Sequence, residues 1–339
     1  MDIHTNIPLK NYLTMKLGGP ARFMANASSK EEVAKLCNNA KSQGLRVFVL
    51  GGGSNTIAHD EAFNGLVIRN RIMGKEIISD SPAESSIRFG AGEVWDEAVQ
   101  FTIEHGLSGI EAMSAIPGTV GAAPVQNIGA YGQELSDTFV ELEAYDMETD
   151  GFVTLDAASC QFAYRNSIFR GEAAGRFAIV SVTLRLFKTV PEPPFYPAVE
   201  KYFAEHNITI FTSNELRGAV MAIRADKLPN PSERPNSGSF FKNAIVEDWQ
   251  LDGLLKEYPD MPHYDLGNKL HKIPTGWLIE QTGLKGKLLH GMRVHDKNAL
   301  VLINESATSF ADLEAARDEV RGAVRDQFRI AIEQEPLEI

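Results

Sequence analysis

Residues 109–132 constrain the fold more than any other stretch of this 339-residue sequence. The segment reads GIEAMSAIPGTVGAAPVQNIGAYG, with five glycines, two prolines and no charged residue after Glu111. A solvated loop would be polar, and a packed helix would not contain this much glycine. The composition favours backbone pressed against a large flat ligand. A tightly packed core of small residues is the alternative.

A second glycine-rich segment follows a predicted β–α–β unit. Residues 29–44 predict a helix, because Ser29 can cap its start and Gly44 can end it. Residues 46–50 predict a short buried strand that leads directly into residues 51–55, GGGSN. Glycines expose backbone N–H groups to an anion, so this turn indicates a phosphate-binding site, with a plain glycine turn as the alternative. The pattern is not GxGxxG and no helix-forming run follows, which argues against a Rossmann dinucleotide fold.

Hydrophobic periodicity along the rest of the sequence predicts a mixed α+β protein. Its first half is rich in strands, and its second half contains more helix. Further strands are predicted near residues 66–69, 75–79, 86–90, 138–146, 178–187, 299–303 and 328–334. Further helices are predicted near residues 93–104, 213–225, 246–257, 275–282 and 309–326. Ser309 and Asp312 resemble a capping box at the last of these. The prolines at 191–197 indicate a boundary, because proline cannot extend the preceding strand.

Charge and cysteine content narrow the functional classes. The formal net charge of −12 argues against nucleic acid or an anionic membrane as the main partner, so a local basic cluster must attract any anionic substrate. Only Cys37 and Cys160 are present, which excludes a disulfide framework and fits a reducing cytoplasm. Neither a signal peptide nor an 18-residue apolar run is found. The eight histidines show no metal-ligand spacing, so we expect a metal-free cytoplasmic protein.

Residues 237–243, SGSFFKN, form a candidate reactive segment. Phe240 and Phe241 can anchor it in apolar surroundings, while Gly238 lets the backbone approach a ligand. Ser239 would then present its hydroxyl to that ligand, with a lysine and an asparagine following closely. Such a cluster suits an anionic, hydrogen-bonding substrate that must receive a proton. The alternative is a surface turn whose two phenylalanines reach into the core.

Eight segments in order carry a resemblance to one family: 15–20 (MKLGGP), 50–55 (LGGGSN), 116–118 (IPG), 126–132 (QNIGAYG), 163–169 (AYRNSIF), 227–231 (KLPNP), 238–243 (GSFFKN) and 277–286 (WLIEQTGLKG). From about residue 5 to its end, the sequence resembles the UDP-N-acetylenolpyruvoylglucosamine reductases, flavoenzymes of bacterial cell-wall synthesis. The resemblance implies an α+β fold with two FAD-binding subdomains of the vanillyl-alcohol-oxidase/PCMH type and a C-terminal α+β substrate domain. We expect these domains at residues 1–70, 71–190 and 191–339.

The resemblance also implies the reaction. NADPH reduces a non-covalently bound FAD and leaves, and UDP-N-acetylglucosamine enolpyruvate binds in its place. Hydride and a proton are then added to the enolpyruvyl ether, which gives the lactyl ether of UDP-N-acetylmuramate for peptidoglycan synthesis. We expect a cytoplasmic monomer that binds no nucleic acid and no membrane.

Three residues match the family's catalytic positions. Ser239 matches the general acid that protonates the substrate carbon, a role for which a serine hydroxyl needs neighbouring positive charge. Arg165 matches the arginine that stabilises negative charge on the substrate carboxylate. Glu333 matches the C-terminal carboxylate by its distance after Phe328. The family usually has Leu-Glu-Pro-Glu where this chain has IEQEP at 332–336, so Glu335 is an alternative, as are two merely solvated carboxylates.

The remaining assignments follow from the resemblance in the same way. Substrate contacts are implied for Tyr131, Tyr164, Tyr196, Arg224, Lys227, Asn243 and Asn298. Tyr196 suggests the longer class of the family, in which a tyrosine closes over the diphosphate, whereas Asn298 stands where the family often has His or Gln. FAD contacts are implied for Gly51, Gly52, Gly53, Ser54, Asn55, Ile116, Pro117, Gly118, Gly121, Gln126, Asn127 and Gly129.

Two other functional classes stay open from sequence. The first is an FAD-dependent oxidase that shares the flavin fold and oxidises an alcohol. Such an oxidase would give no reason for Ser239 to lie beside cations. The second is a nucleotide-sugar binding protein without catalysis, which would carry no flavin.

Overall fold

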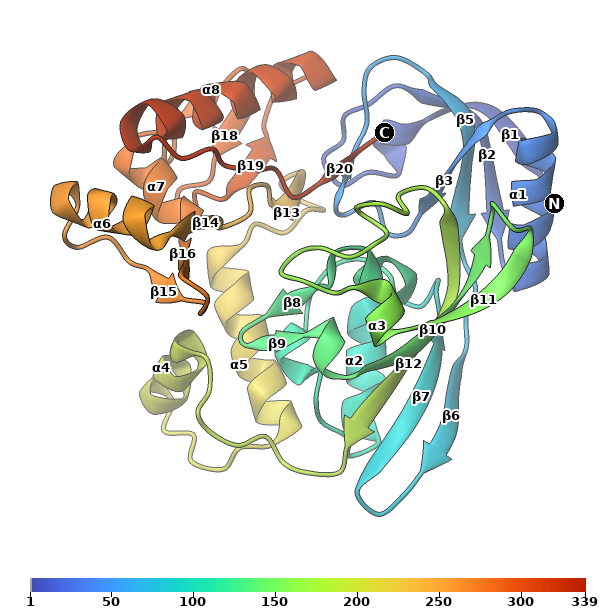
Figure 1. Ribbon diagram of the computed structural model, residues 1–339, viewed down its shortest axis with the longest axis horizontal. Coiled ribbons are helices and arrows are strands. Elements are labelled where there is room, and N and C mark those ends of the chain that lie inside the picture. Colours follow the sequence, from blue (N-terminus) through green and yellow to red (C-terminus); the bar gives the residue numbers. More distant parts are fainter. Residues whose placement is uncertain (1) are drawn as a thin grey trace. The chain divides into compact units, whose positions relative to one another are not determined.

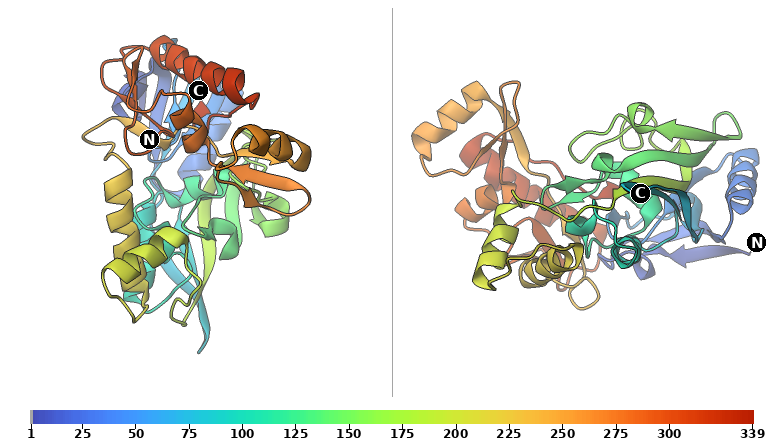
Figure 2. Two further views of the ribbon diagram at one scale, coloured as in Figure 1. Left: turned by 90° about the vertical axis from the view of Figure 1, so that its left-hand side faces the viewer. Right: turned by 90° about the horizontal axis from the view of Figure 1, so that it is seen from below.

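The computed structural model of the protein describes residues 2–339 and shows two compact units (Figures 1 and 2). Unit 1 comprises Met1–Ile7, Pro20–Gly53 and Ala62–Asp226. Unit 2 comprises Pro8–Gly19, Ser54–Glu61 and Lys227–Ile339. The expected three-domain division stays a prediction. The compact units differ from it, because residues 191–226 group with unit 1 and two short N-terminal segments group with unit 2.

Unit 1 begins with a four-stranded sheet and the helix that crosses it. The strand order is β1-β2-β5-β3, formed by β1 (Ile3–Pro8), β2 (Pro20–Ala27), β5 (Phe63–Asn70) and β3 (Arg46–Leu50). Strands β2 and β3 both pair parallel with β5, so a crossover must connect them. Helix α1 (Lys30–Ser42) provides it and lies along the sheet (Figure 1), with the Glu32 N–H donating to the Ser29 hydroxyl at 3.3 Å. The predicted β–α–β unit is confirmed.

The second sheet of unit 1 is antiparallel, in the order β11-β10-β12-β7-β6. Its strands are β6 (Lys75–Asp80), β7 (Glu84–Gly90), β10 (Phe139–Asp146), β11 (Gly151–Asp156) and β12 (Phe177–Phe187). Helix α2 (Trp95–Glu104) joins their core through Trp95 and Val99, both at most 1 % exposed. The sequence predicted every strand of this sheet except β11.

The glycine-rich segment folds into short pieces packed within unit 1. They are η2 (Glu111–Met113), η3 (Val120–Gln126) and β8 (Gly129–Ala130), and β9 (Gln133–Glu134) and η4 (Leu135–Asp137) follow directly. Val120 and Ala123 are buried in the core of the second sheet. A Cβ at Gly121 would lie 2.5 Å from the Cβ of Ala91, so close packing alone requires glycine at this position. Tight small-residue packing therefore accounts for part of the composition.

Two helices and a short turn of helix complete unit 1. Helices α4 (Pro197–Glu205) and α5 (Ser213–Lys227) share a small core that includes Val199, Phe203 and Val220, and α3 (Ala157–Cys160) follows β11. Helix α4 was not predicted because the prolines before it suggested a boundary. Pro197 instead occupies the first turn of the helix, where the missing N–H costs nothing.

Unit 2 combines two small sheets with three α-helices and one 3-10 helix. One sheet has the order β13-β19-β18-β17 and the other β14-β16-β15, while β20 pairs with β4. The strands are β4 (Thr56–Ile57), β13 (Asn236–Ser239), β14 (Ala244–Glu247), β15 (Tyr264–Asp265), β16 (Leu270–Ile273), β17 (Leu288–Leu289), β18 (Met292–Val294), β19 (Val301–Asn304) and β20 (Leu337–Glu338). The helices are η1 (Leu9–Asn11), α6 (Asp248–Glu257), α7 (Thr275–Gln281) and α8 (Phe310–Phe328).

The end of α8 corrects one prediction. Ser309 and Asp312 form the predicted capping box at its start. The helix then runs to Phe328, and Arg329 takes a left-handed φ of 58° that turns the chain away. The predicted strand over 328–334 is therefore wrong, because only Gln334 forms an isolated bridge, to Phe241.

Among residues 2–339, no helix combines the length and apolar character needed to cross a membrane.

An ion pair with a buried carboxylate joins the end of β10 to the residue that precedes β12 in unit 1. Asp146, 1 % exposed at the end of β10, accepts two hydrogen bonds from Arg176, at 3.0 and 2.7 Å. The Glu148 N–H and the Thr149 hydroxyl also donate to it, each at 3.0 Å. The hydrogen bonds from Arg176 are the main reason that the pKa of Asp146 lies well below its usual range.

We predict that Asp146→Asn lowers the free energy of unfolding by about 1–3 kcal/mol at pH 7, because it breaks charge-assisted hydrogen bonds to a buried acceptor. The pKa of Asp146 is depressed in the fold, so its contribution is complete above the unfolded carboxyl pKa of about 4 and declines as the pH falls below that value. Urea unfolding should show the difference from wild type shrinking in acid. Asp150→Asn, which loses only an exposed pair with Lys41, should cost about 0–1 kcal/mol at every pH. A pH-independent cost for Asp146→Asn would contradict the prediction.

Candidate functional site

The two predicted flavin segments of unit 1 lie against each other. A Cβ at Gly51 would meet the Thr119 hydroxyl at 2.5 Å, and a Cβ at Gly52 would meet Gly118 Cα at 2.9 Å. Gly53 and Gly118 have positive φ angles of 67° and 131°, conformations that glycine adopts without strain. Backbone without side chains, at the end of a strand, is the surface that binds a diphosphate. These loops therefore fit the diphosphate of FAD.

A carboxylate at the start of α2 fixes the second of these loops. Asp96 accepts a hydrogen bond from the Ala115 N–H at 2.6 Å, just before the predicted contacts Ile116 and Pro117. It also accepts two hydrogen bonds from Arg217 of α5, at 2.6 and 2.8 Å. Burial would raise the pKa of Asp96, but the bonds from Arg217 and Ala115 outweigh it and the pKa is lowered. Sequence analysis missed this pair, because the partners are 121 residues apart.

The predicted contacts at 126–129 differ in what their side chains do. Gln126 accepts a hydrogen bond from Arg170 at 3.2 Å. Asn127 is 1 % exposed, donates to Glu134 at 2.9 Å and accepts from the Ser136 N–H at 3.0 Å. The Asn127 side chain therefore holds the shape of the loop from inside the protein.

Arg165 is fixed against the same segment. It occupies a tight turn between Ala163 and Asn166 with a left-handed φ of 51°. Its guanidinium donates to the carbonyl oxygen of Gly129 at 2.6 Å and lies 5.5 Å from the ring of Tyr164. The predicted carboxylate-binding arginine is thus held in place by a predicted flavin residue.

A cluster of aromatic and cationic side chains stands beside Arg165 in unit 1. The Tyr131 and Tyr196 rings pack edge to face at 5.6 Å, and Tyr196 is 46 % exposed. Desolvation lowers the pKa of Arg224, as does the charge of Arg165, while Tyr131 and Asp96 oppose this. Burial also raises the pKa of Tyr131. The like charges of Arg165 and Arg224 would be compensated by an anionic ligand, so this cluster favours one. The two arginines and the two tyrosines were all predicted to contact the substrate.

In unit 2, Ser239 ends β13, opposite Val301 of β19. Gly238 has a φ of 72°, and its N–H donates to Asn236 at 2.8 Å. Phe240 and Phe241 are 0 % and 1 % exposed, with ring centroids 5.2 Å apart. The predicted anchoring by the two phenylalanines is confirmed, and it leaves Ser239 half-buried at the edge of the core.

The other predicted residues of unit 2 have mixed surroundings. Asn243 accepts from the Thr275 N–H at 3.1 Å, and the fully buried Thr275 hydroxyl accepts from Ala244 at 2.9 Å. Sequence analysis missed Thr275, which orients this side chain. Asn298 accepts from the Leu300 N–H at 3.2 Å and so supports its own turn. Lys227 is exposed at the end of α5.

The two candidate carboxylates occupy one extended segment next to the reactive motif. The Glu333 side chain is 74 % exposed and lies 3.1 Å from the Lys242 ammonium. Glu335 is half-buried, and its N–H donates to the carbonyl oxygen of Phe240 at 2.8 Å. Of the two, Glu335 has the environment with less water.

Sequence comparison identifies the family. Residues 21–154 match the model of an FAD binding domain, and residues 230–339 match that of the UDP-N-acetylenolpyruvoylglucosamine reductase C-terminal domain. The reductase of Ralstonia nicotianae is 39 % identical over 98 % of this chain and 98 % of its own length. This chain belongs to the UDP-N-acetylenolpyruvoylglucosamine reductase family. The reductase of Flavobacterium johnsoniae is likewise 39 % identical, over 99 % of each chain.

Solved structures support the fold. UDP-N-acetylenolpyruvylglucosamine reductase from Thermus caldophilus matches with a TM-score of 0.69 at 22 % identity, over 100 % of this chain and 99 % of that one. 6-Hydroxy-D-nicotine oxidase from Arthrobacter nicotinovorans matches with a TM-score of 0.50 at 16 % identity, over 92 % and 81 % of the chains. The predicted α+β flavoprotein fold with a C-terminal reductase domain is confirmed.

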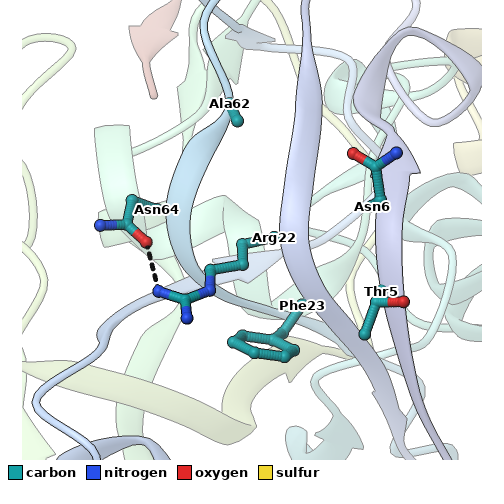
Figure 3. A pocket seen from close by; sticks show the side chains of 6 residues that line it. All are labelled: Thr5, Asn6, Arg22, Phe23, Ala62 and Asn64. Carbon is teal, nitrogen blue, oxygen red and sulfur yellow. Dashed lines mark hydrogen bonds between the residues drawn. The ribbon is translucent and has the colours of Figure 1, made fainter.

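A separate open pocket of about 420 Å³ lies on the first sheet of unit 1 (Figure 3). It is lined by Thr5, Asn6, Arg22, Phe23, Ala62 and Asn64. Arg22 donates to Asn64 at 2.8 Å and lies 5.1 Å from the Phe23 ring centre. None of the predicted catalytic, substrate or flavin residues lines it.

We predict that Gly52→Ala reduces the flavin content of the purified protein, since the new Cβ would force the two glycine loops apart at a cost of about 1–3 kcal/mol. The ratio of flavin to protein absorbance measures it. Gly218→Ala is the matched control in the same unit, because a Cβ there meets no atom within 4 Å. The control should retain full flavin and gain about 0.4–1 kcal/mol of stability. Full flavin content in Gly52→Ala would contradict the predicted role of the contact.

Proposed function

We propose that this chain is an FAD-dependent oxidoreductase that uses NADPH to reduce UDP-N-acetylglucosamine enolpyruvate to UDP-N-acetylmuramate. The observation that carries the proposal is 39 % identity to named reductases across 98 % of the chain. The two glycine loops add a physical reason, because their side-chain-free backbone suits the FAD diphosphate. Bound FAD would take up hydride from NADPH and supply it to the enolpyruvyl double bond.

Arg165 is proposed to hold the substrate carboxylate. Addition of hydride beside a carboxylate builds negative charge on the carboxylate oxygens, and a guanidinium fixed in advance stabilises that charge. The bond from Arg165 to Gly129 and the turn that carries it support this role, since both restrict the guanidinium before the substrate arrives. Arg224, with its lowered pKa, would add charge in a partly desolvated position.

Ser239 is proposed to deliver the proton. The buried pair Phe240 and Phe241 fixes the backbone that carries the hydroxyl, so the proton can be held at a defined point. A serine hydroxyl is a weak acid, so the role requires positive charge beside it, and Lys242 is proposed as one source because it follows three residues later in the chain. Lys227 and Asn243 are proposed to bind the nucleotide-sugar part of the substrate, and Tyr131, Tyr164 and Tyr196 to line its path. Asn298 stays a weaker proposal, because its amide oxygen already serves its own turn.

We also propose that the protein acts as a cytoplasmic monomer. Cys37 and Cys160 are both free and buried, and burial raises the pKa of each thiol to about 12. Such thiols suit a reducing compartment. Light scattering of the purified flavoprotein would test the monomer.

Anaerobic stopped-flow absorbance tests the assignment directly. NADPH should bleach the flavin, and the enolpyruvyl substrate should restore its colour without oxygen. An alcohol oxidase of the same fold would instead bleach with an alcohol and recolour with oxygen. A purified protein without flavin would favour a nucleotide-sugar binding protein.

We predict that Ser239→Ala leaves bleaching by NADPH near the wild-type rate but slows recolouring by substrate about 10²–10⁴-fold, the usual contribution of general acid catalysis. Single-turnover stopped-flow separates the two phases. Asn304→Ala, which alters β19 of the same sheet away from the motif, serves as a packing control. Equal slowing of both phases by Ser239→Ala would place the hydroxyl outside the proposed role.

The C-terminal carboxylate can be assigned by a matched pair of variants. Glu333 was the sequence-based choice, but its exposure and its pairing with Lys242 favour Glu335 as the group that faces a partly desolvated substrate. We predict that Glu335→Gln slows recolouring by at least about 10²-fold, whereas Glu333→Gln has an effect of less than about tenfold. The reverse order in single-turnover rates would restore Glu333 to the role.

A further inference from the structure

The last seven residues form an extended segment, here called the C-terminal strap, that connects two parts of unit 2 (Figure 1). At one end, the Lys242 N–H donates to the Glu333 carbonyl at 2.9 Å and the Glu335 N–H donates to Phe240 at 2.8 Å. At the other end, the Leu337 N–H donates to the carbonyl of Asn55 at 3.0 Å. The strap therefore joins the segment that carries Ser239 to the end of the glycine motif.

The two faces of the strap have different partners. Side chains alternate along an extended chain, so Gln334 and Glu338 point to one face and the candidate carboxylates, Glu333 and Glu335, to the other. Arg317 of α8 binds the first face. It donates to Gln334 Oε1 at 3.0 Å and to Glu338 Oε1 at 2.7 Å.

Arg317 is built as a fixed clamp. It is 8 % exposed, and its guanidinium also donates to Glu314 at 2.9 Å and to Asp318 at 3.0 Å. Burial opposes its charge, but Asp318, Glu338 and Glu314 outweigh this and raise the pKa of Arg317. A charged, planar donor with several acceptors has one favourable orientation, so it can hold a partner in a single register.

Register decides which carboxylate stands beside the reactive motif. A slip of one residue would put Pro336, which has no N–H, where the strap donates to the neighbouring backbone. A slip of two residues keeps an N–H at both donor positions of Glu335 and Leu337. It moves Glu335 into the place of Glu333, or Glu333 into the place of Glu335, depending on its direction.

Either slip also removes both acceptors of Arg317. In one direction Pro336 takes the place of Gln334 and no residue takes that of Glu338. In the other direction Ile332 takes the place of Gln334 and Pro336 that of Glu338. The Arg317 contacts would therefore be lost in either slip. The 3.3 Å contact of Glu338 with His59 would be lost as well, and the buried side chain of Ile332 would leave its place in the core, so Arg317 acts together with these contacts to select the observed register.

We propose that Arg317 is a positioning residue that locks the register of the C-terminal strap and so sets which C-terminal carboxylate serves the reaction. The catalytic part of this inference rests on the proposed function, whereas the register lock does not. Arg317 acts on the face opposite the carboxylates, through Gln334 and Glu338, and touches neither carboxylate in the contacts described.

Two measurements on the flavin-loaded protein test the lock. Arg317→Met keeps the length of the side chain and removes its donors, and Gln334→Leu removes an acceptor from the strap. Arg321→Met is the matched control, one helical turn further along α8, where Arg321 is half exposed and pairs only weakly, at 3.7 Å, with Asp318. Hydrogen exchange reports the strap amides of Glu335 and Leu337, and single-turnover stopped-flow reports the two flavin phases.

In Arg317→Met we expect exchange at Glu335 and Leu337 to accelerate at least about tenfold, while amides of α8 and β19 keep their protection. Bleaching by NADPH should stay within about twofold, and recolouring by substrate should slow on the order of 10²-fold, the effect of a small misplacement of a reacting group. Gln334→Leu should act in the same direction, and the double variant should be less than additive. Arg321→Met should match wild type.

The outcomes separate the inference from the proposed function. Unchanged strap exchange in Arg317→Met overturns the register lock whatever the activity. Loss of protection throughout unit 2, with both flavin phases slowed alike, shows a general structural role and also overturns it. If wild type itself fails to recolour with the enolpyruvyl substrate, the proposed function fails, and the exchange data alone then decide the lock. If Arg317→Met does not fold, Gln334→Leu carries the same test.

Discussion

The contact between two glycine loops is the constraint on which the rest of unit 1 depends. Gly52 and Gly118 approach so closely that a single methyl group at Gly52 would lie 2.9 Å from a backbone carbon. The first loop, which contains Gly52, follows β3 directly. The second loop, which contains Gly118, is held to α2 by the hydrogen bond from the Ala115 N–H to Asp96. The end of β3 and the segment between η2 and η3 therefore meet at the same place. The arginine and tyrosine cluster is attached to the continuation of the second loop, through the bond from Arg165 to Gly129.

Much of this architecture can be predicted from local sequence. The capping residues Ser29 and Ser309 mark the starts of α1 and α8, and alternating apolar residues mark β12. These signals are contained within a few residues, so no tertiary information is needed. The strand predicted over 328–334 is wrong because that prediction used local signals alone. The apolar residues of this segment suit a strand, but no neighbouring segment pairs with it beyond a single bridge at Gln334.

A residue of the candidate site can be predicted only where the neighbouring residues in the sequence determine its role. Phe240 and Phe241 were expected to anchor Ser239, and their burial follows from their adjacency and size. Asp96 and Arg217 could not be found, because neither residue shows locally that the other lies 2.6 Å away. The same holds for Arg317, which has an ordinary surface-helix sequence around it and becomes a clamp only when the end of the chain reaches it.

The pairing of β20 with β4 also fixes an order of assembly. Leu337 lies opposite Thr56, so a strand near the start of the chain waits for a partner about 280 residues later. During synthesis, every residue of unit 1 is added before Lys227–Ile339, whereas unit 2 lacks its last strand until the final residues appear. Domains generally form as units in the order in which they are made. Strand β4 must therefore wait for its partner β20 until translation ends, and their pairing closes a long loop.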